Sequence, residues 1–171
     1  MPFPAAAVAN EFLTIAKAQN KDLTPLKLQK LVYFAHGWYL ALTGEPLILE
    51  TIQAWQYGPV IPALYREFRD YGNGTIGTPA VRSEFKGGRF TMFVPQLDTY
   101  GQKKEEVDRA RQVIGKVWEI YGGFSSIRLS NATHVPGGPW ERVYKEGSKS
   151  IPIPNEEIRK YFTELGHATG H

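Results

Sequence analysis

Residues 25 to 43 constrain the fold most, because they have helical spacing and are apolar on two opposite sides. Thr24 precedes Pro25 as an N-cap precedes a proline at the first helical position, and Gly44 is a residue that commonly ends a helix. One apolar side contains Leu28, Leu31, Val32, Ala35, Trp38, Tyr39 and Leu42, and the other contains Leu26, Tyr33 and Leu40. Other elements must cover both sides, so we expect this helix at the centre of a mainly helical fold.

Six further segments have the spacing or the capping residues of helices. They are residues 5–17, 62–71 and 102–121, a short segment from Ser125 or Ser126 toward His134, a segment that Pro139–Trp140 opens, and a last one after Pro154. The segment 102–121 has the clearest pattern, with apolar residues every three or four positions and charged residues elsewhere. We therefore predict a mainly α (α+β) fold, a compact bundle of about six or seven helices.

Short runs rich in β-branched and aromatic residues predict a small β element. Residues 45–60 contain two such runs, which break at Gly58–Pro59, and residues 90–94 contain a third. Residues 72–89 are dense in glycine, threonine and serine, which predicts a long flexible loop. We expect a small antiparallel hairpin or three-stranded sheet within a single domain of residues 1–171, with its core between about residues 5 and 165.

The composition is typical of one intracellular globular domain. With 171 residues, 42% of them hydrophobic, the chain can bury one sizeable core. It has no cysteine, no basic start followed by an apolar run, and no stretch of the ~20 apolar residues that a membrane span needs. Its 20 basic and 17 acidic residues are scattered, which argues against a nucleic-acid partner. We expect a cytoplasmic protein that does not bind membranes.

Two local patterns resemble enzyme motifs but lack the context that the chemistry needs. Residues 72–77 match the G-x-G-x-x-G fingerprint, yet a predicted helix precedes them and Thr78–Pro79 follows, where a dinucleotide site needs a strand and then a helix. We interpret this run as a glycine loop. The serines at 125, 126 and 130 could be combined with His134 and Glu141 into a nucleophilic triad, but no G-x-S-x-G turn supports it.

The histidines are candidates for a site or for the interior of the fold. His36 and His134 are about a hundred residues apart, and neither has the histidine partner four positions away that metal-binding helices use. We favour buried histidines with hydrogen bonds inside the fold, and a role in a site is the alternative. His167 and His171 lie in a tail that we expect to fray.

Aromatic residues make up 13% of the chain and either fill the core or contact a partner. Trp38 and Trp118 lie within helical stripes and are expected in the core, whereas Trp55 and Trp140 adjoin turns and could face solvent. The hypothesised partner-binding residues are Trp55, Tyr57, Arg66, Arg69, His36, His134 and Trp140. In the competing interpretation, which is slightly preferred, the aromatic residues at 55 and 57 belong to a strand core and the two arginines form a solvated helix face.

Three blocks of the sequence resemble the Panacea domain, which occurs in SocA-like antitoxins and GepA-like phage-associated proteins. The first block is Leu23–Leu47, the second runs from Thr51 to Tyr71, and the third contains Leu129–His134 and Pro139–Trp140. The resemblance implies a helical domain with a small β element that neutralises a growth-inhibiting toxin, usually encoded by the adjacent gene, by direct binding. For some relatives it also implies delivery of the toxin to a protease.

We therefore expect an antitoxin that acts by protein–protein binding, is not an enzyme, and needs no cofactor or metal. Two alternatives come from other classes. A small hydrolase or nucleotide-acting enzyme would use His36 and His134, which would then lie in one pocket with an acid or a metal. A nucleic-acid-binding regulator would use lysines and arginines gathered in a stripe on one face, and its binding would depend steeply on salt.

Overall fold

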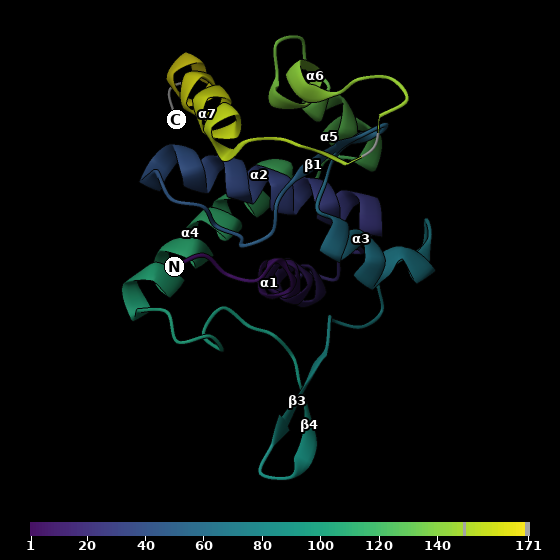
Figure 1. Ribbon diagram of the computed structural model, residues 1–171, viewed down its shortest axis with the longest axis vertical. Coiled ribbons are helices and arrows are strands. Elements are labelled where there is room, and N and C mark those ends of the chain that lie inside the picture. Colours follow the sequence, from purple (N-terminus) through teal and green to yellow (C-terminus); the bar gives the residue numbers. More distant parts are fainter. Residues whose placement is uncertain (149, 170–171) are drawn as a thin grey trace.

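A computed structural model describes residues 1–148 and 150–169, and within them seven α-helices surround one hydrophobic core (Figure 1). The helices are α1 (Ala5–Ala18), α2 (Pro25–Thr43), α3 (Pro62–Phe68), α4 (Lys104–Tyr121), α5 (Ser126–Thr133), α6 (Pro139–Val143) and α7 (Asn155–Thr169). A 3-10 turn, η1 (Arg69–Tyr71), continues α3. The prediction of a mainly helical fold with about six or seven helices is confirmed.

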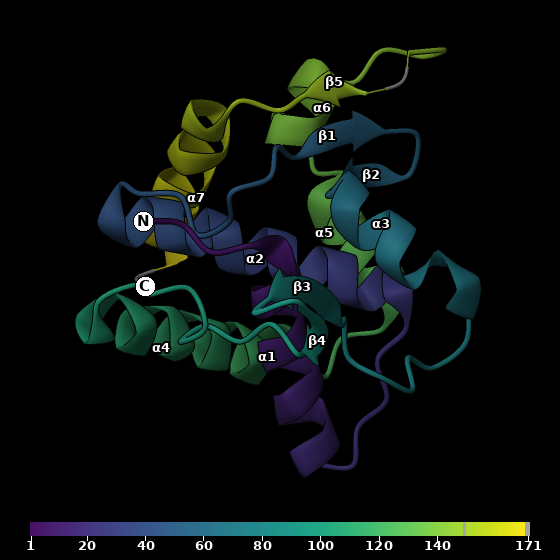
Figure 2. The same ribbon diagram turned by 60° about the horizontal axis from the view of Figure 1, so that its bottom comes forward.

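Helix α2 lies at the centre of the molecule, with α1 and α4 on one side and α7 and α5 on the other (Figures 1 and 2). The Thr24 side chain accepts a hydrogen bond from the Lys27 amide, and Gly44 adopts a left-handed conformation at the other end. Both apolar sides are buried as predicted, apart from Trp38, which is half-buried, and Leu26 and Leu42 at the ends, which are exposed. Trp118 belongs to the core as expected, and the half-buried Trp38 packs against it.

Helices α2 and α7 are in close contact at Gly37. A Cβ atom at this position would lie 2.1 to 2.6 Å from ring atoms of Phe162, so the ring fills the space that a larger residue would need. Tyr33, Phe34 and Trp38 surround the same ring edge-to-face, with centroids 5.2 to 5.9 Å away. A small residue in α2 therefore lets a large residue of α7 anchor the carboxyl-terminal helix.

Three short strands form an antiparallel sheet in the order β2, β1, β5. They are β1 (Gln53–Trp55), β2 (Gly58–Val60) and β5 (Ile151–Pro152). The break that we predicted at Gly58–Pro59 is instead the start of β2, and the third strand comes from a two-residue segment too short to show a pattern. The small antiparallel β element is otherwise confirmed.

A separate antiparallel hairpin occupies part of the segment predicted as a loop. Its strands are β3 (Arg82–Lys86) and β4 (Arg89–Phe93), joined by Gly87 and Gly88. Both glycines have positive φ, 60° and 78°, as a tight two-residue hairpin turn requires. The loop assignment was therefore wrong for residues 82–89, because the glycines make a turn there, whereas residues 72–81 are irregular as predicted.

From the sequence we expected His167 and His171 in a tail that frays, and no segment that spans a membrane. His167 lies within α7, while His171 lies outside the described residues. Among the described residues, no helix is both long enough and apolar enough to cross a membrane.

Candidate functional site

A groove with a cavity volume of about 950 Å³ lies where four parts of the chain meet. They are the start of α2, the turn between β1 and β2, the segment from α3 through η1, and the chain after α6. Aromatic and polar side chains line it, among them Leu26, Gln29, Lys30, Trp55, Tyr57, Val60, Tyr65, Arg69, Tyr144 and Glu146. A groove of this size that mixes apolar walls with a few polar groups is typical of a binding site.

Hydrogen bonds and ring contacts hold the aromatic wall of the groove in place. The half-buried Trp55 ring meets Tyr65 edge-on with centroids 5.0 Å apart, and its Nε1 donates to Gln53 Oε1 at 2.9 Å. Trp140 Nε1 donates to the backbone oxygen of Trp55 at 2.6 Å, and the Trp140 ring stacks on Tyr144. These contacts join α6 to β1, so the wall has a fixed shape before any ligand arrives.

Lys30 forms part of the groove lining although its side chain is wholly buried. Its Nζ donates to two backbone oxygens, those of Tyr57 at 3.2 Å and Pro59 at 3.3 Å, and forms no salt bridge with a carboxylate of the described residues. Burial lowers the pKa of this amine from 10.5 to about 8. A buried cation that only carbonyls stabilise places positive charge behind the turn between β1 and β2.

At Gly58 that turn lies close to α2 and α5. The φ of Gly58 is +116°, a conformation that residues with a Cβ atom rarely adopt. A Cβ atom there would also lie 2.5 Å from Lys30 Nζ and 3.1 Å from His134 Cε1. The glycine therefore lets the carbonyls on both sides of it reach the amine.

The structure separates the predicted partner-binding residues into groups. Trp55, Tyr57 and Arg69 line the groove, and Tyr57 is the most exposed of its aromatic residues, at 72%. Arg66 is exposed on α3 but does not line the groove. Trp140 supports the wall from behind.

His36 lies in a different part of the fold and is wholly buried. Its Nδ1 accepts the amide hydrogen of Ile48 at 3.3 Å, so its Nε2 carries the proton and donates to Asn155 Oδ1 at 2.8 Å. Burial lowers the pKa of the imidazole to about 4, and the bond to Asn155 opposes this only in part. His36 is thus a neutral histidine that joins α2 to the start of α7.

His134 ends α5 and packs against Trp140, with ring centroids 4.3 Å apart. Its Nδ1 donates to the backbone oxygen of Ser130 at 2.6 Å. It shares no hydrogen-bond partner with His36, and neither histidine lines the groove. The described residues contain no group of three histidine or acidic side chains that could hold a metal ion.

The serines considered for a triad have structural partners. Ser125 accepts the Arg128 amide hydrogen as the N-cap of α5, and the Ser126 hydroxyl lies 3.4 Å from that of Thr24. Ser130 contacts His134 through its backbone oxygen. Within the part of the chain that the structure describes, no serine hydroxyl is hydrogen-bonded to this histidine.

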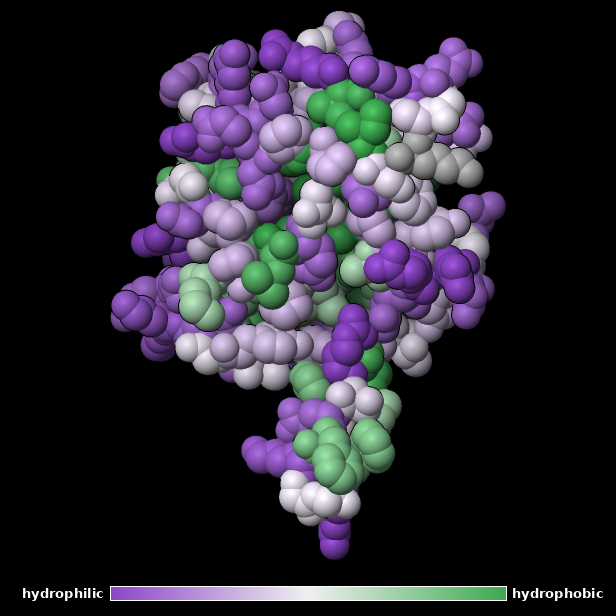
Figure 3. Space-filling view, viewed as in Figure 1, coloured by the Kyte–Doolittle hydropathy of each residue, from purple (hydrophilic) through white to green (hydrophobic). Residues whose placement is uncertain are grey.

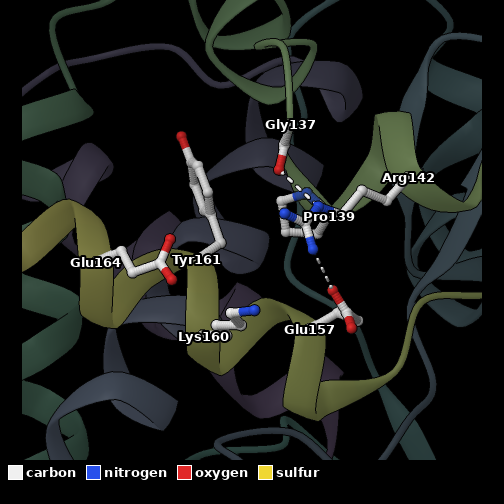
Figure 4. Close-up of a pocket in the computed structure, with 7 residues that line it drawn as sticks. All are labelled: Gly137, Pro139, Arg142, Glu157, Lys160, Tyr161 and Glu164. Carbon is white, nitrogen blue, oxygen red and sulfur yellow. Dashed lines mark hydrogen bonds and ion pairs between the residues drawn. The ribbon is translucent and has the colours of Figure 1, made fainter.

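A second, much smaller pocket lies between α6 and α7 (Figure 4). Arg142 spans it, donating to the Gly137 oxygen at 3.0 Å and to Glu157 at 3.4 Å. The cavity volume of this pocket is about 10 Å³, which has room for roughly one water molecule. We interpret it as a polar junction between two helices.

Of the residues that line the groove, the sequence predicted only Trp55, Tyr57 and Arg69, and it missed the others, among them Lys30, Tyr65 and Tyr144. Lys30 carried a usable signal, because it is a cation on a flank of a helix that is otherwise buried on two sides. Tyr144 carried none, since only the tertiary fold brings it beside residues that precede it by about 90 positions.

The chain thus has a mainly helical fold with a groove lined by aromatic and polar side chains. A family model described as "Antitoxin SocA-like, Panacea domain" matches residues 28–141. The antitoxin SocA of Caulobacter vibrioides (strain NA1000 / CB15N) is 34% identical over 139 residues, which cover 81% of this chain and 69% of that protein. The chain belongs to the SocA-like antitoxin family with a Panacea domain.

Membership of this family supports an antitoxin role and suggests a non-enzymatic one. The matched segment contains most of the groove, from Gln29 to Asn73, and excludes Tyr144. No solved structure matches the chain.

Proposed function

We propose that this protein is an antitoxin that neutralises a toxin, the product of the adjacent gene, by binding it directly through the aromatic groove. The observation that carries the proposal is the prebuilt aromatic wall within the segment that matches the antitoxin family. We further propose that residues 1–171 act as a single binding domain.

The groove has the properties of a protein-binding surface. Tyrosine, tryptophan and arginine are the commonest anchors of protein interfaces, and Tyr57, Trp55 and Arg69 supply one of each. Tyr57 is the anchor that an incoming partner would cover most, because 72% of it is exposed. Since Trp55 and Trp140 already have fixed contacts, little side-chain entropy is lost when the partner binds.

The two candidate arginines provide a matched test. Arg66 and Arg69 are both exposed and lie three positions apart, but only Arg69 lines the groove. We expect Tyr57→Ala and Arg69→Ala each to weaken binding to the adjacent gene's product about tenfold or more, and Arg66→Ala to change it less than twofold. Isothermal titration calorimetry measures the affinities, and thermal melting verifies that each variant folds.

The wild type and the same variants test two points separately: whether the protein binds the toxin, and whether it does so through the groove. If the wild-type protein neither rescues growth nor co-purifies with the adjacent gene's product, the toxin-binding function is wrong. If the wild type binds and both groove variants bind equally well, the toxin occupies another surface.

Direct occlusion and delivery to a protease predict different toxin levels. We propose occlusion. A toxin bound in the groove has part of its surface covered, and this mechanism needs no protease. Toxin should then persist in rescued cells, as quantitative immunoblotting after translation arrest would show. Rapid loss of toxin that depends on this protein would instead establish the adaptor mechanism.

A further inference from the structure

The β3–β4 hairpin projects from the body of the molecule (Figures 1 and 3). Its residues are exposed on both faces, apart from the half-buried Arg82 and Phe93 at its base. The paired residues are Arg82 with Phe93, Ser83 with Met92, Glu84 with Thr91, Phe85 with Phe90, and Lys86 with Arg89. Paired residues of an antiparallel ladder point to the same face, and successive pairs alternate between faces. The register therefore divides the hairpin into an apolar face and a charged face.

The apolar face is uncovered. Phe85, Phe90 and Met92 are 65%, 78% and 66% exposed, and the residues at its base, Val81 and Val94, are each 39% exposed. The two phenylalanine rings lie against each other with centroids 5.1 Å apart. Figure 3 shows hydrophobic side chains, in green, on the projecting hairpin. A contiguous apolar patch of this kind on a surface marks an interaction site.

The charged face has an excess of positive charge at the tip of the hairpin. Lys86 and Arg89 lie directly opposite each other, and like charges in this position destabilise a hairpin. Neither forms a salt bridge within the described part of the chain, whereas Arg82 at the base pairs with Glu67 at 3.0 Å. Both features oppose folding of a two-stranded ribbon, which is marginal in water by itself.

We propose that the hairpin inserts into a cleft of the toxin that has an apolar wall on one side and carboxylates on the other. This inference rests on the toxin-binding function proposed above and names the chemistry of the partner. The apolar wall covers Phe85, Phe90 and Met92, and the carboxylates neutralise the opposed cations at the tip. One complementary cleft thus removes both destabilising features.

Two other occupants fit the charges less well. A second copy of the chain brings the same cations, because its hairpin has three basic residues and only one acidic residue, Glu84. A membrane presents its anionic headgroups and its apolar interior from the same side, whereas the cations and the apolar residues of the hairpin lie on opposite faces.

The test uses one variant for each face. Phe90→Ser with Met92→Ser removes two of the three most exposed side chains of the apolar face, and Lys86→Glu with Arg89→Glu reverses the charge at the tip. Lys160→Glu, at an exposed lysine of α7, controls for the reversal of a surface charge away from the hairpin. We expect both double variants to weaken binding to the adjacent gene's product at least tenfold, and Lys160→Glu to change it less than twofold. The charge variant should also bind with a weaker dependence on salt.

Failure of this inference differs from failure of the toxin-binding function. If the wild type binds the toxin and Tyr57→Ala weakens binding, but both hairpin variants bind like the wild type, the hairpin proposal is wrong and the groove proposal stands. Light scattering of the free protein and co-sedimentation with vesicles of phosphatidylcholine and phosphatidylglycerol test the other occupants. Dimerisation or vesicle binding that Phe90→Ser with Met92→Ser abolishes, with toxin affinity unchanged, would also overturn it.

Discussion

At the scale of single residues, Lys30 is the least expected feature of the protein. A buried ammonium group normally has a carboxylate partner, because removing its charge from water costs several kcal/mol. Among the residues that the structure describes, only the carbonyls of Tyr57 and Pro59 accept hydrogen bonds from its Nζ in place of the lost water, and Gly58 makes this geometry possible. The buried charge therefore destabilises the fold, while its hydrogen bonds to these carbonyls fix the turn that carries Tyr57.

The pH dependence of stability should reveal this charge. The pKa of Lys30 is about 8 in the folded protein and 10.5 in the unfolded chain, so between these values the unfolded chain binds the proton more strongly. The free energy of unfolding should therefore rise with pH across this window, by about 3 kcal/mol from this residue alone, and the full cost of burial applies below pH 8.

Urea titrations of the wild type and of Lys30→Met, from pH 7 to 10.5, isolate the contribution of Lys30. Buried tyrosines also titrate at high pH, but they are common to both proteins and cancel in the difference. The stability of the wild type relative to the variant should increase with pH. A constant difference would mean that Lys30 keeps its ordinary pKa in the fold.

At the scale of elements, the contact between α2 and α7 depends on one glycine and one aromatic ring. Gly37→Ala should destabilise the protein by about 1–3 kcal/mol, although alanine favours helix formation, because its Cβ would overlap the Phe162 ring. Adding Phe162→Leu should recover part of this loss, since the two changes share one space.

Gly115 in α4 is the matched control for this prediction. A Cβ atom there would meet no atom within 4 Å, so Gly115→Ala should stabilise the protein by about 0.5–1 kcal/mol. Urea denaturation measures the free energy of unfolding of the wild type, Gly37→Ala, Gly37→Ala with Phe162→Leu, and Gly115→Ala. Equal effects at the two glycines would show that Phe162 does not limit the approach of α2 and α7.

Sequence patterns predicted the helices better than the strands and the site, for physical reasons. Helical spacing repeats over many residues, so α2 and α4 were predicted nearly to their ends. The strand β5 has two residues and no period, and β3 was hidden because glycine is common both in loops and in tight hairpin turns. Trp55 and Tyr57 were found by residue type, but the difference between Arg66 and Arg69 depends on where α3 meets the groove.

At the scale of the whole molecule, the groove and the hairpin share no residue and no hydrogen bond among those described, yet both are proposed to contact one toxin. Such independent contacts make additive contributions to the free energy of binding. Tyr57→Ala combined with Phe90→Ser and Met92→Ser should therefore lower toxin affinity by the product of the separate factors, about a hundredfold if each factor is tenfold.

Hydrogen exchange of the complex provides an independent measurement. Toxin should protect backbone amides at residues 55–58 and 82–93 together, while the exposed face of α7 exchanges as in the free protein. If the groove and the hairpin served different partners, the combined variant would bind toxin no more weakly than one of its parents, and only one segment would be protected. Additivity and joint protection would together show that one toxin spans both surfaces.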